Sequence, residues 1–327
     1  MRGLRPKPQT AGQLPFVRPK SSRAHEGKMA SAASSIDSGL VRRLVASQFP
    51  QWADLSVRPV ARSGWDNRTF HLGDGMLVRL PSAQAYAAQV AVEQRWLPFF
   101  APYLPLPIPE PLAMGTPNHG YPWNWSVYRW IPGEASSREN ISSLPDFSRQ
   151  LAAFLTSLQR IDATSGPQPS PNNFYRGGSL AVYDDQARSA IAALGGRIDG
   201  SAAIRVWSEA LSTYWERPPV WVHGDIAAGN LLLNRGSLAA VIDFGQLAVG
   251  DPACDLAIAW TLLRGDSRKA FCKTLALDPS TWQRGRAWAL WKAMIVAAGM
   301  TATNADEGML CWQVIDEVLG EHEQTGA

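Results

Sequence analysis

The stretch that decides the fold is "VHGDIAAGNLLL", residues 222–233. The apolar run "PPVWV" at 218–222 precedes its polar part and three leucines follow it, a pattern that predicts two strands joined by an exposed turn. His223, Asp225 and Asn230 all fall in this turn. A carboxylate and an amide placed between two buried-type strands make the turn our first candidate for chemistry.

A second polar group follows shortly afterwards, in "AAVIDFGQLAVGDPACDLA". Residues 239–242 form a buried-type strand that ends at Asp243, and pairing through a turn at 234–236 would bring Asn230 and Asp243 to the same end of one hairpin. An amide and a carboxylate offer the hard oxygen ligands that suit Mg²⁺ and leave room for water and nucleotide phosphates. Asp225 lies just before them and is placed to accept a proton from an attacking hydroxyl.

The chain before this hairpin is predicted to form a small sheet with helices. Short strands rich in Val, Leu, Thr and Phe alternate with Gly-containing turns, which is typical of an antiparallel meander. An amphipathic helix opens this part, and a run of good helix formers before Pro98 crosses the sheet. The predicted elements are the helix 36–49, the strands 55–61, 68–73 and 75–81, the helix 83–97 and the strand 125–131.

The chain after "PGE" at 132–134 is predicted to be mostly helical, with Asp146 as the cap of its first helix. We therefore divide the sequence into a disordered basic tail at 1–28, a first lobe at 29–131 and a second lobe at 132–327. The tail is either an over-extended start or an arm for targeting or binding. Further helices are predicted near 183–194, 202–215, 253–264, 281–300 and 307–319.

Composition and charge exclude several classes of protein. The 31 basic and 28 acidic side chains give a net charge of +3, but seven of the basic residues lie in 1–28 against one acid. The remainder is therefore about neutral, whereas a nucleic-acid-binding protein needs a basic stripe, so we expect no nucleic-acid partner. No apolar run approaches the length of a membrane span and no signal-peptide core opens the chain, which predicts a cytoplasmic protein without membrane contact.

The two polar motifs together resemble those of kinases. "HGDIAAGN" is similar to the catalytic loop H-R-D-x-x-x-x-N, and "IDFG" is similar to the metal-binding D-F-G. Gly224 in place of the arginine, followed by "VGDPACDLA", looks like the aminoglycoside phosphotransferase family. The resemblance is densest over 221–259 and extends weakly from about Leu55 to the C-terminus. It implies an α+β, bilobal protein-kinase-like fold, with a small antiparallel-sheet N-terminal lobe and a larger, mostly helical C-terminal lobe.

The same resemblance implies the activity and the roles of the motif residues. Family enzymes use ATP or GTP, bound between the lobes, and transfer the γ-phosphate to a hydroxyl of a small molecule. Asp225 would be the base or the orienting acceptor for that hydroxyl, and Asn230 and Asp243 would hold Mg²⁺. His223 is interpreted as a structural residue of the loop, because the reaction needs only one acceptor group.

The predicted nucleotide contacts in the first lobe are less specific. "RSGWDNRTF" lies where kinases keep a glycine-rich phosphate loop but has a single glycine, so Ser63, Gly64 and Asn67 are our phosphate contacts, with an ordinary hairpin turn as the alternative. Backbone groups from Tyr128 to Trp130 occupy the link between the lobes, where the resemblance implies hydrogen bonds to adenine. A plain buried strand is the alternative for this segment.

Arg79 stands on the third strand, where family enzymes carry a lysine. No lysine occurs anywhere in the first lobe. The resemblance implies that Arg79 binds the phosphates and pairs with Glu93 on the following helix. A planar guanidinium reaches a phosphate and a carboxylate together, but with a geometry that differs from that of an ammonium. The alternative is a solvated arginine on an edge strand.

No motif identifies the acceptor. Residues 160–327 hold 18 acidic and 14 basic side chains, a net charge of −4 that suits a cationic aminosugar. Trp288 and Trp291 are at helical spacing, so we interpret them as core rather than as platforms for sugar rings. Asp266 and Glu307 are candidate pocket acids that the sequence does not separate from solvated helix charges.

Three hypotheses of function stay open. The first is a small-molecule kinase with an aminoglycoside-like acceptor, or one of the sugar, choline or homoserine type. The second is a catalytically silent nucleotide-binding regulator, which Arg79 and the thin glycine loop allow. The third is a protein kinase, disfavoured because Gly224 replaces the usual arginine and no activation segment follows Gly245. The sequence leaves open the acceptor, the choice between ATP and GTP, and the oligomeric state.

Overall fold

A computed structural model of the chain describes residues 36–61, 64, 66–301 and 305–325, with the backbone alone for 305–307 and 323–325. These residues belong to a single unit, Ile36–Ala327. The predicted tail at 1–28 and the predicted phosphate contact Ser63 lie outside the described residues. Among the helices of the described ranges, none is long and apolar enough to cross a membrane.

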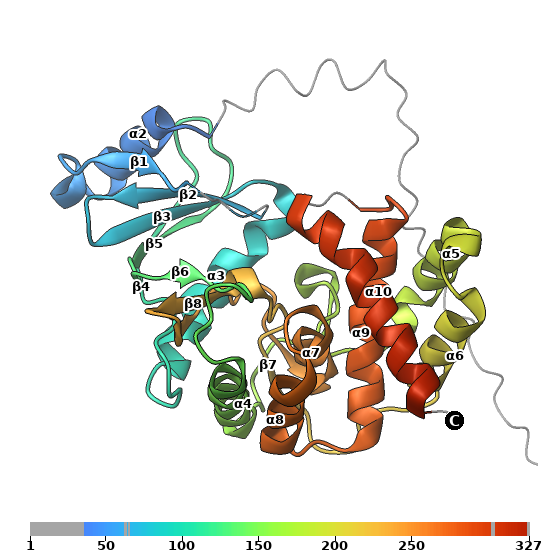
Figure 1. Cartoon of the computed structure of the whole chain (residues 1–327). Coiled ribbons are helices and arrows are strands. Elements are labelled where there is room, and N and C mark those ends of the chain that lie inside the picture. Colours follow the sequence, from blue (N-terminus) through green and yellow to red (C-terminus); the bar gives the residue numbers. More distant parts are fainter. Residues whose placement is uncertain (1–35, 62–63, 65, 302–304, 326–327) are drawn as a thin grey trace, which may run out of the picture. The chain divides into compact units, whose positions relative to one another are not determined.

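A five-stranded sheet forms the first part of the structure (Figure 1). Its strands are antiparallel, in the order β1-β2-β3-β5-β4. Because side chains alternate along a strand, Val78 and Leu80 of β3 face one side of the sheet and Arg79 faces the other. The strands are β1 (Val57–Pro59), β2 (Asn67–Leu72), β3 (Met76–Pro81), β4 (Pro111–Gly115) and β5 (Trp125–Arg129).

Two helices pack on this sheet and belong to different hydrophobic cores. Helix α2 (Ser38–Gln48) buries its leucine and valine face against Val78, Leu80 and Trp125. Helix α3 (Gln84–Phe100) contributes its apolar residues to the core of the larger, helical part, which also takes Tyr128 from the sheet. The sheet face that carries Arg79 is therefore the one that meets α3 and the helical part.

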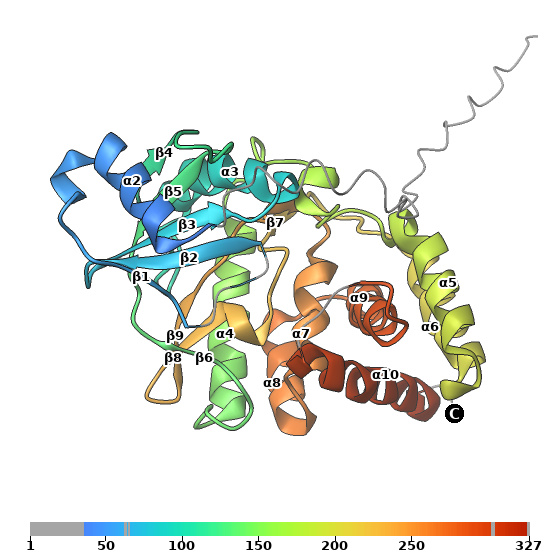
Figure 2. The same ribbon diagram turned by 90° about the horizontal axis from the view of Figure 1, so that it is seen from above.

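The helical part follows β5 and contains two small sheets (Figure 2). One sheet has the order β6-β8-β9, with β6 (Glu134–Ala135), β8 (Leu231–Asn234) and β9 (Ser237–Val241), and the other pairs β7 (Val220–Val222) with β10 (Ala248–Gly250). The helices are α4 (Leu144–Arg160), α5 (Asp184–Leu194), α6 (Gly200–Leu211), α7 (Ile258–Thr261), α8 (Gly265–Leu275), α9 (Pro279–Ala297) and α10 (Ala305–Thr325).

The hairpin predicted from the leucine run is confirmed. Leu231 of β8 pairs with Val241 of β9, and the backbone N–H of Ile242 donates to the carbonyl oxygen of Asn230 at 2.9 Å. Arg235 and Gly236 form its turn with φ angles of 49° and 77°. The open end of this hairpin consequently holds Asn230 beside the residue that precedes Asp243.

Several local predictions need correction. The cap of α4 is Ser143, whose hydroxyl accepts a hydrogen bond from the N–H of Asp146, so Asp146 lies in the first turn and is not the cap. Its charge is favourable there because the first turn carries the positive end of the helix dipole. Helix α3 continues past Pro98 to Phe100, which is fully buried. The strands β4, β6 and β10 were not predicted, because pairing with neighbouring strands, and not a pattern in their own sequence, defines them. Helix α8 was not predicted either.

A tight contact in the first sheet gives a test of its packing. Gly115 ends β4 against the fully buried Trp125, and a Cβ at this position would lie 2.0 Å from the indole ring. We expect Gly115→Ala to lower the free energy of unfolding by about 2 kcal/mol and the Tm by several degrees, as measured by thermal unfolding. Gly196→Ala is the control, since a Cβ there meets nothing within 4 Å. Equal Tm values for the two variants would contradict this packing.

Candidate active site

Asp255 holds the start of the loop that carries Asp225. The backbone N–H groups of His223 and Gly224 donate to the two carboxylate oxygens of Asp255, at 2.8 and 2.7 Å. Asp255 is fully buried in the 3₁₀ turn Pro252–Ala257, and Asp251 caps that turn by accepting from Ala253. The buried carboxylate therefore fixes the direction in which the chain enters the loop.

Gly224 is required at its position for two reasons. Its φ of 85° lies in the left-handed region, which glycine adopts without strain. A Cβ would also approach the carbonyl oxygen of Gln246 to 2.5 Å and the Cγ atom of Arg176 to 3.0 Å. The arginine that protein kinases carry here has no room in this chain.

His223 links the loop to the end of β9. Its Nδ1 accepts from the backbone N–H of Asp225 at 3.2 Å, and its Nε2 lies 3.1 Å from the carbonyl oxygen of Ile242, to which it donates in this tautomer. Burial lowers the pKa of His223, more than the nearby Asp255 and Asp243 raise it, so the ring stays neutral. These contacts support the structural role that we predicted for His223.

Asn230 orients Asp225 from the other end of the loop. Its Nδ2 donates to the carbonyl oxygen of Asp225 at 2.9 Å and to the carboxylate Oδ2 at 3.1 Å. Both donors come from the same amide nitrogen, so the amide oxygen of Asn230 is not used in these two contacts. The loop thus brings a carboxylate and an amide into direct contact across five positions.

Arg79 joins the sheet to the hairpin through two ion pairs. Its Nη1 lies 3.1 Å from Oε1 of Glu93 on α3, and its Nη2 lies 2.7 Å from Oδ1 of Asp243. The side chain of Arg79 is 15% exposed, so it is not the solvated edge-strand residue of the alternative reading. Glu93 also accepts from the Tyr128 hydroxyl and, at 3.0 Å, from the backbone N–H of Phe244.

The pKa values follow from this pairing. Burial would raise the pKa of Asp243, but the charge and hydrogen bond of Arg79 lower it overall. Burial raises the pKa of Glu93 despite the opposing charge of Arg79. The pKa of Arg79 is raised well above its usual range because Asp243 and Glu93 outweigh its burial. Arg79 therefore stays charged and holds the carboxylate of Asp243 in its ionised form.

Asp225 is more basic than an ordinary aspartate. Burial raises its pKa and the charge of Asp243 adds to this, against the opposing effects of Arg176, Lys292 and Asn230. A carboxylate with a raised pKa is better suited to accept a proton. Sequence reasoning missed Arg176 and Lys292, because only the fold brings them near this loop; the run "NFYRGG" around Arg176 carries no known motif.

The loop between β1 and β2 places one more carboxylate near the hairpin. Burial and the negative charges of Asp243 and Asp225 raise the pKa of Asp66 to about 6, despite the opposing effects of Gln89 and Arg79. Sequence reasoning passed over Asp66, although "GWDN" places it between the two residues predicted as phosphate contacts.

The remaining predicted nucleotide contacts lie in the first sheet, in the segment before β2 and in the link after β5. Asn67 is buried at the start of β2, and the carbonyl oxygen of Gly64 accepts from Arg68 at 3.3 Å. The N–H of Trp130 donates to the carbonyl oxygen of Gly75 at 2.9 Å, so this donor is already used. The ring of Trp130 packs on His71 at 4.4 Å between centroids. A base contact at the link accordingly falls to its carbonyl oxygens and stays a prediction.

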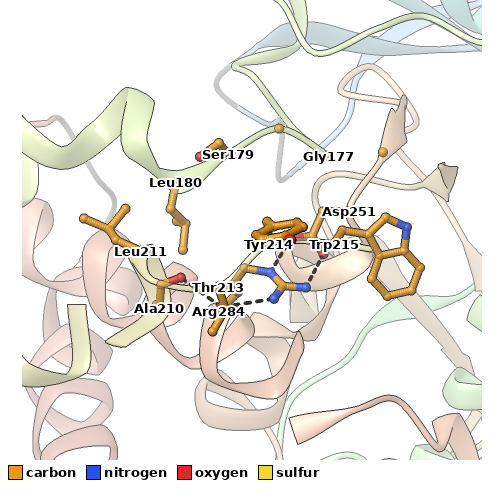
Figure 3. Close-up of a pocket in the computed structure, with 12 residues that line it drawn as sticks. Gly177, Ser179, Leu180, Ala210, Leu211, Thr213, Tyr214, Trp215, Asp251 and Arg284 are labelled. Atoms are coloured by element: carbon orange, nitrogen blue, oxygen red, sulfur yellow. Dashed lines mark hydrogen bonds and ion pairs between the residues drawn. The ribbon is translucent and has the colours of Figure 1, made fainter. Parts of the chain in front are cut away.

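A separate hollow lies between α6, α9 and the segment around Gly177 (Figure 3). Its volume is about 230 Å³ and its charged groups are Arg284 and Asp251, which form an ion pair at 2.6 Å. Arg284 also bonds the hydroxyls of Thr213 and Thr281, so its donors are used inside the protein. We assign this hollow a structural role, because its polar groups bind one another and it contains none of the predicted site residues.

The candidate acceptor residues are settled in part. Trp288 and Trp291 are buried at 3% and 5% exposure, which confirms them as core residues. Asp266 forms an exposed pair with Lys269 on α8, at 3.4 Å, and is a solvated helix charge. The side chain of Glu307 lies outside the described residues.

The open end of the hairpin fits a hard divalent cation. Asn230 and Asp243 supply an amide and an ionised carboxylate from neighbouring strand ends, and oxygen donors of this kind suit Mg²⁺. Asp225, with its raised pKa, lies in contact with the same amide. An amide, an ionised carboxylate, a second carboxylate with a raised pKa and the buried cation Arg79 thus occur together, a set whose chemistry suits a phosphorylated ligand and a hydroxyl.

Comparison with known proteins agrees with this geometry. A family model described as the phosphotransferase enzyme family matches residues 56–288. No curated protein matches the sequence significantly. The family match covers the sheet, the loop, the hairpin and most of α9.

Solved structures match over most of the chain at low sequence identity, which shows a shared fold. The GDP complex of a mutant aminoglycoside 2'-phosphotransferase is 16% identical, with a TM-score of 0.68, and the alignment covers 89% of this chain and 100% of that one. The GDP and kanamycin complex of an APH(2") enzyme is 17% identical, with a TM-score of 0.65 and coverages of 88% and 99%. The macrolide 2'-phosphotransferase from Brachybacterium faecium is 19% identical, with a TM-score of 0.55 and coverages of 85% and 98%.

The raised pKa of Asp66 predicts an unusual pH dependence of stability. The folded protein binds this proton more tightly than the unfolded chain, so the free energy of unfolding falls as pH rises from about 4 to about 6. At pH 7.5 we expect Asp66→Asn to be more stable than the parent by about 1 kcal/mol, or roughly 2–4 °C in Tm. The gain should shrink below pH 5, where Asp66 is protonated.

The matched control for this measurement is Asp54→Asn, which removes an exposed carboxylate of the same region. Its Tm should follow the parent at both pH values. A gain for Asp66→Asn that is the same at pH 4.5 and 7.5, or absent at both, would contradict the repulsion that we assign to this residue.

Proposed function

Since the chain belongs to the phosphotransferase enzyme family, we propose that it moves the γ-phosphate of ATP or GTP to a hydroxyl of a small molecule. One observation carries the proposal. Asp225, Asn230 and Asp243 gather at the open end of one hairpin, and Arg79 reaches Asp243 from the sheet. Phosphoryl transfer depends mainly on positioning and on electrostatic stabilisation, which such a fixed set of charges supplies.

Asp225 is the proton acceptor in this proposal. The acceptor oxygen forms a bond to the γ-phosphorus while the bond from that phosphorus to the bridging oxygen of the diphosphate breaks. The hydroxyl proton passes to the Asp225 carboxylate, whose raised pKa favours the transfer. Asn230 donates a hydrogen bond to that carboxylate, and the ring of His223 accepts one from the backbone N–H of Asp225. These two contacts keep the carboxylate in place.

Asn230 and Asp243 are the residues that would hold Mg²⁺. When bound, the ion neutralises charge on the nucleotide phosphates. The lowered pKa of Asp243 keeps its carboxylate ionised and ready for a cation. Arg79 already contacts Asp243, so this carboxylate would serve both the guanidinium and the metal.

The nucleotide contacts remain proposals. Arg79 replaces the family's lysine, with Glu93 and Tyr128 as supports that limit its movement. Ser63, Gly64 and Asn67 would cover the phosphates, and the link from Tyr128 to Trp130 would meet the base. We assign nucleotide binding to 29–131 and catalysis with acceptor binding to 132–327.

The class of acceptor has less direct support than the reaction itself. The similar structures are named as aminoglycoside and macrolide phosphotransferases, which makes an aminoglycoside-like acceptor the first candidate. Sugars, choline and homoserine remain alternatives. A silent nucleotide-binding regulator is disfavoured, because Asp225, Asn230 and Asp243 are all present and in contact or close proximity. Release of ADP or GDP over a panel of these acceptors, with casein as the protein substrate, tests the reaction.

Removing the proton acceptor should abolish turnover and spare nucleotide binding. We expect Asp225→Asn to reduce kcat by about 10²–10⁴-fold, because asparagine keeps the shape of the side chain but does not accept the proton. Nucleotide affinity, measured by fluorescence titration with MgATP and MgGTP, should change less than threefold or so. Unchanged turnover in this variant would refute the role of Asp225.

Removing the proposed metal ligand should instead abolish the effect of Mg²⁺ on binding. We expect Asp243→Asn to bind ATP with the same affinity with and without Mg²⁺, whereas the parent binds at least about tenfold tighter with the metal. Thermal unfolding serves as the check on folding, since Asp243 also pairs with the buried Arg79. A variant that keeps the full response to Mg²⁺ would show that Asp243 is not a ligand.

A further inference from the structure

Two cations of the helical part are placed to act on Asp225. Arg176 comes from the segment between α4 and α5, and Lys292 comes from α9. Both oppose the rise in the pKa of Asp225, so their charges are felt at the carboxylate that would receive the hydroxyl proton. An acceptor whose hydroxyl reaches Asp225 must therefore bind close to both positive charges.

Arg176 is fixed by packing on three sides. Its stem lies over Gly224, where an added Cβ would meet the Cγ atom of Arg176 at 3.0 Å. Its Nε donates to Oε1 of Gln246 at 2.9 Å, and its guanidinium lies 4.9 Å from the centroid of the Trp288 ring. This combination holds the planar group in one orientation, and within the described part of the chain Nε is the guanidinium nitrogen that donates a hydrogen bond.

Lys292 lies one helical turn after Trp288, so the two residues share a face of α9. Trp288 is the residue on which Arg176 stacks, so Lys292 lies on the face of α9 against which Arg176 packs. The lysine is exposed. Among the described side chains, neither Arg176 nor Lys292 forms a salt bridge, although a buried or stacked arginine usually has an acidic partner.

Several acidic side chains of the helical part pair with arginines of the same part. Within the described ranges, Glu209 pairs with Arg286, Asp251 with Arg284, Asp184 with Arg188, and Glu317 and Glu321 with Arg268. Arg176 and Lys292 are not part of these pairs, and their positive charges reach Asp225 together with the negative charge of Asp243.

We infer that the acceptor carries an anionic group, a carboxylate or a phosphate ester, close to the hydroxyl that is phosphorylated, and that Arg176 and Lys292 bind it. The inference rests on the proposed function and narrows its substrate class. A fixed guanidinium with free terminal N–H groups matches a planar or tetrahedral oxyanion, and a nearby ammonium adds a second charge. A polycationic aminosugar in the same place would bring its ammonium groups close to Arg176 and Lys292, whose like charges repel them.

The test uses pairs of acceptors that differ in charge. ADP and GDP release is measured with gluconate against glucose, glycerate against glycerol, glycerol 3-phosphate against glycerol, and kanamycin as the cation. We expect the preferred acceptor to be anionic, with a kcat/KM at least about tenfold higher than that of its neutral counterpart. The carboxylate and phosphate-ester pairs show which of the two anions the site takes.

Variants assign the preference to the two cations. Arg176→Gln and Lys292→Gln should each lower the ratio of anionic to neutral kcat/KM by about tenfold or more, mainly through KM, and Arg176→Lys should restore part of it. The ratio is insensitive to a general loss of folded protein, since both acceptors are measured on one sample. Lys273→Gln is the matched control, because it removes an exposed lysine from α8.

The outcomes distinguish a failure of the inference from a failure of the proposed function. The inference is wrong if neutral or cationic acceptors are phosphorylated and no anionic acceptor has a higher kcat/KM than its neutral counterpart. The phosphotransferase function then stands. A preference that survives in both variants also overturns it. If no acceptor is phosphorylated and neither nucleotide binds, the proposed function fails, and the inference fails with it.

Discussion

The double ion pair of Arg79 is the interaction on which the rest of the site depends. A buried guanidinium is stable only with its charge compensated, and here one carboxylate comes from α3 and the other from the end of the hairpin. The pairing fixes the sheet, α3 and β9 at a single point. Because Tyr128 and the N–H of Phe244 also bond Glu93, loss of Arg79 would leave buried acceptors and donors in an unbalanced cluster.

The buried carboxylate of Asp255 fixes the start of the loop, as Arg79 fixes the end of the hairpin. It accepts two backbone N–H groups at the start of the loop, and His223 ties the next residues to β9. The loop and the hairpin end therefore hold each other through uncharged ring and backbone contacts. Asp243 follows with a φ of 70°, a left-handed conformation that aspartate tolerates better than most residues and that these contacts maintain.

Net charge is a poor guide to what this site binds. The helical part is acidic as a whole, yet several of its described acids pair with arginines within the protein. The electric field at Asp225 depends instead on nearby groups. Asp243 contributes negative charge, and Arg176 and Lys292 contribute positive charge. Asp66 belongs to the same balance, since its raised pKa reports the negative charge already gathered near the hairpin.

The sequence by itself determined the two-part fold, the hairpin and the residues at its end, because hydrophobic periodicity and turn residues act over short distances and the motif spacing is fixed along the chain. The resemblance of its motifs to those of kinases also implied Arg79 and Glu93 as partners. Only the tertiary structure decided that Arg79 also bonds Asp243, 164 positions away, and that Asp66, Arg176 and Lys292 approach Asp225. Charges act through space, so residues distant in sequence and free of any local pattern became visible only when the chain was folded.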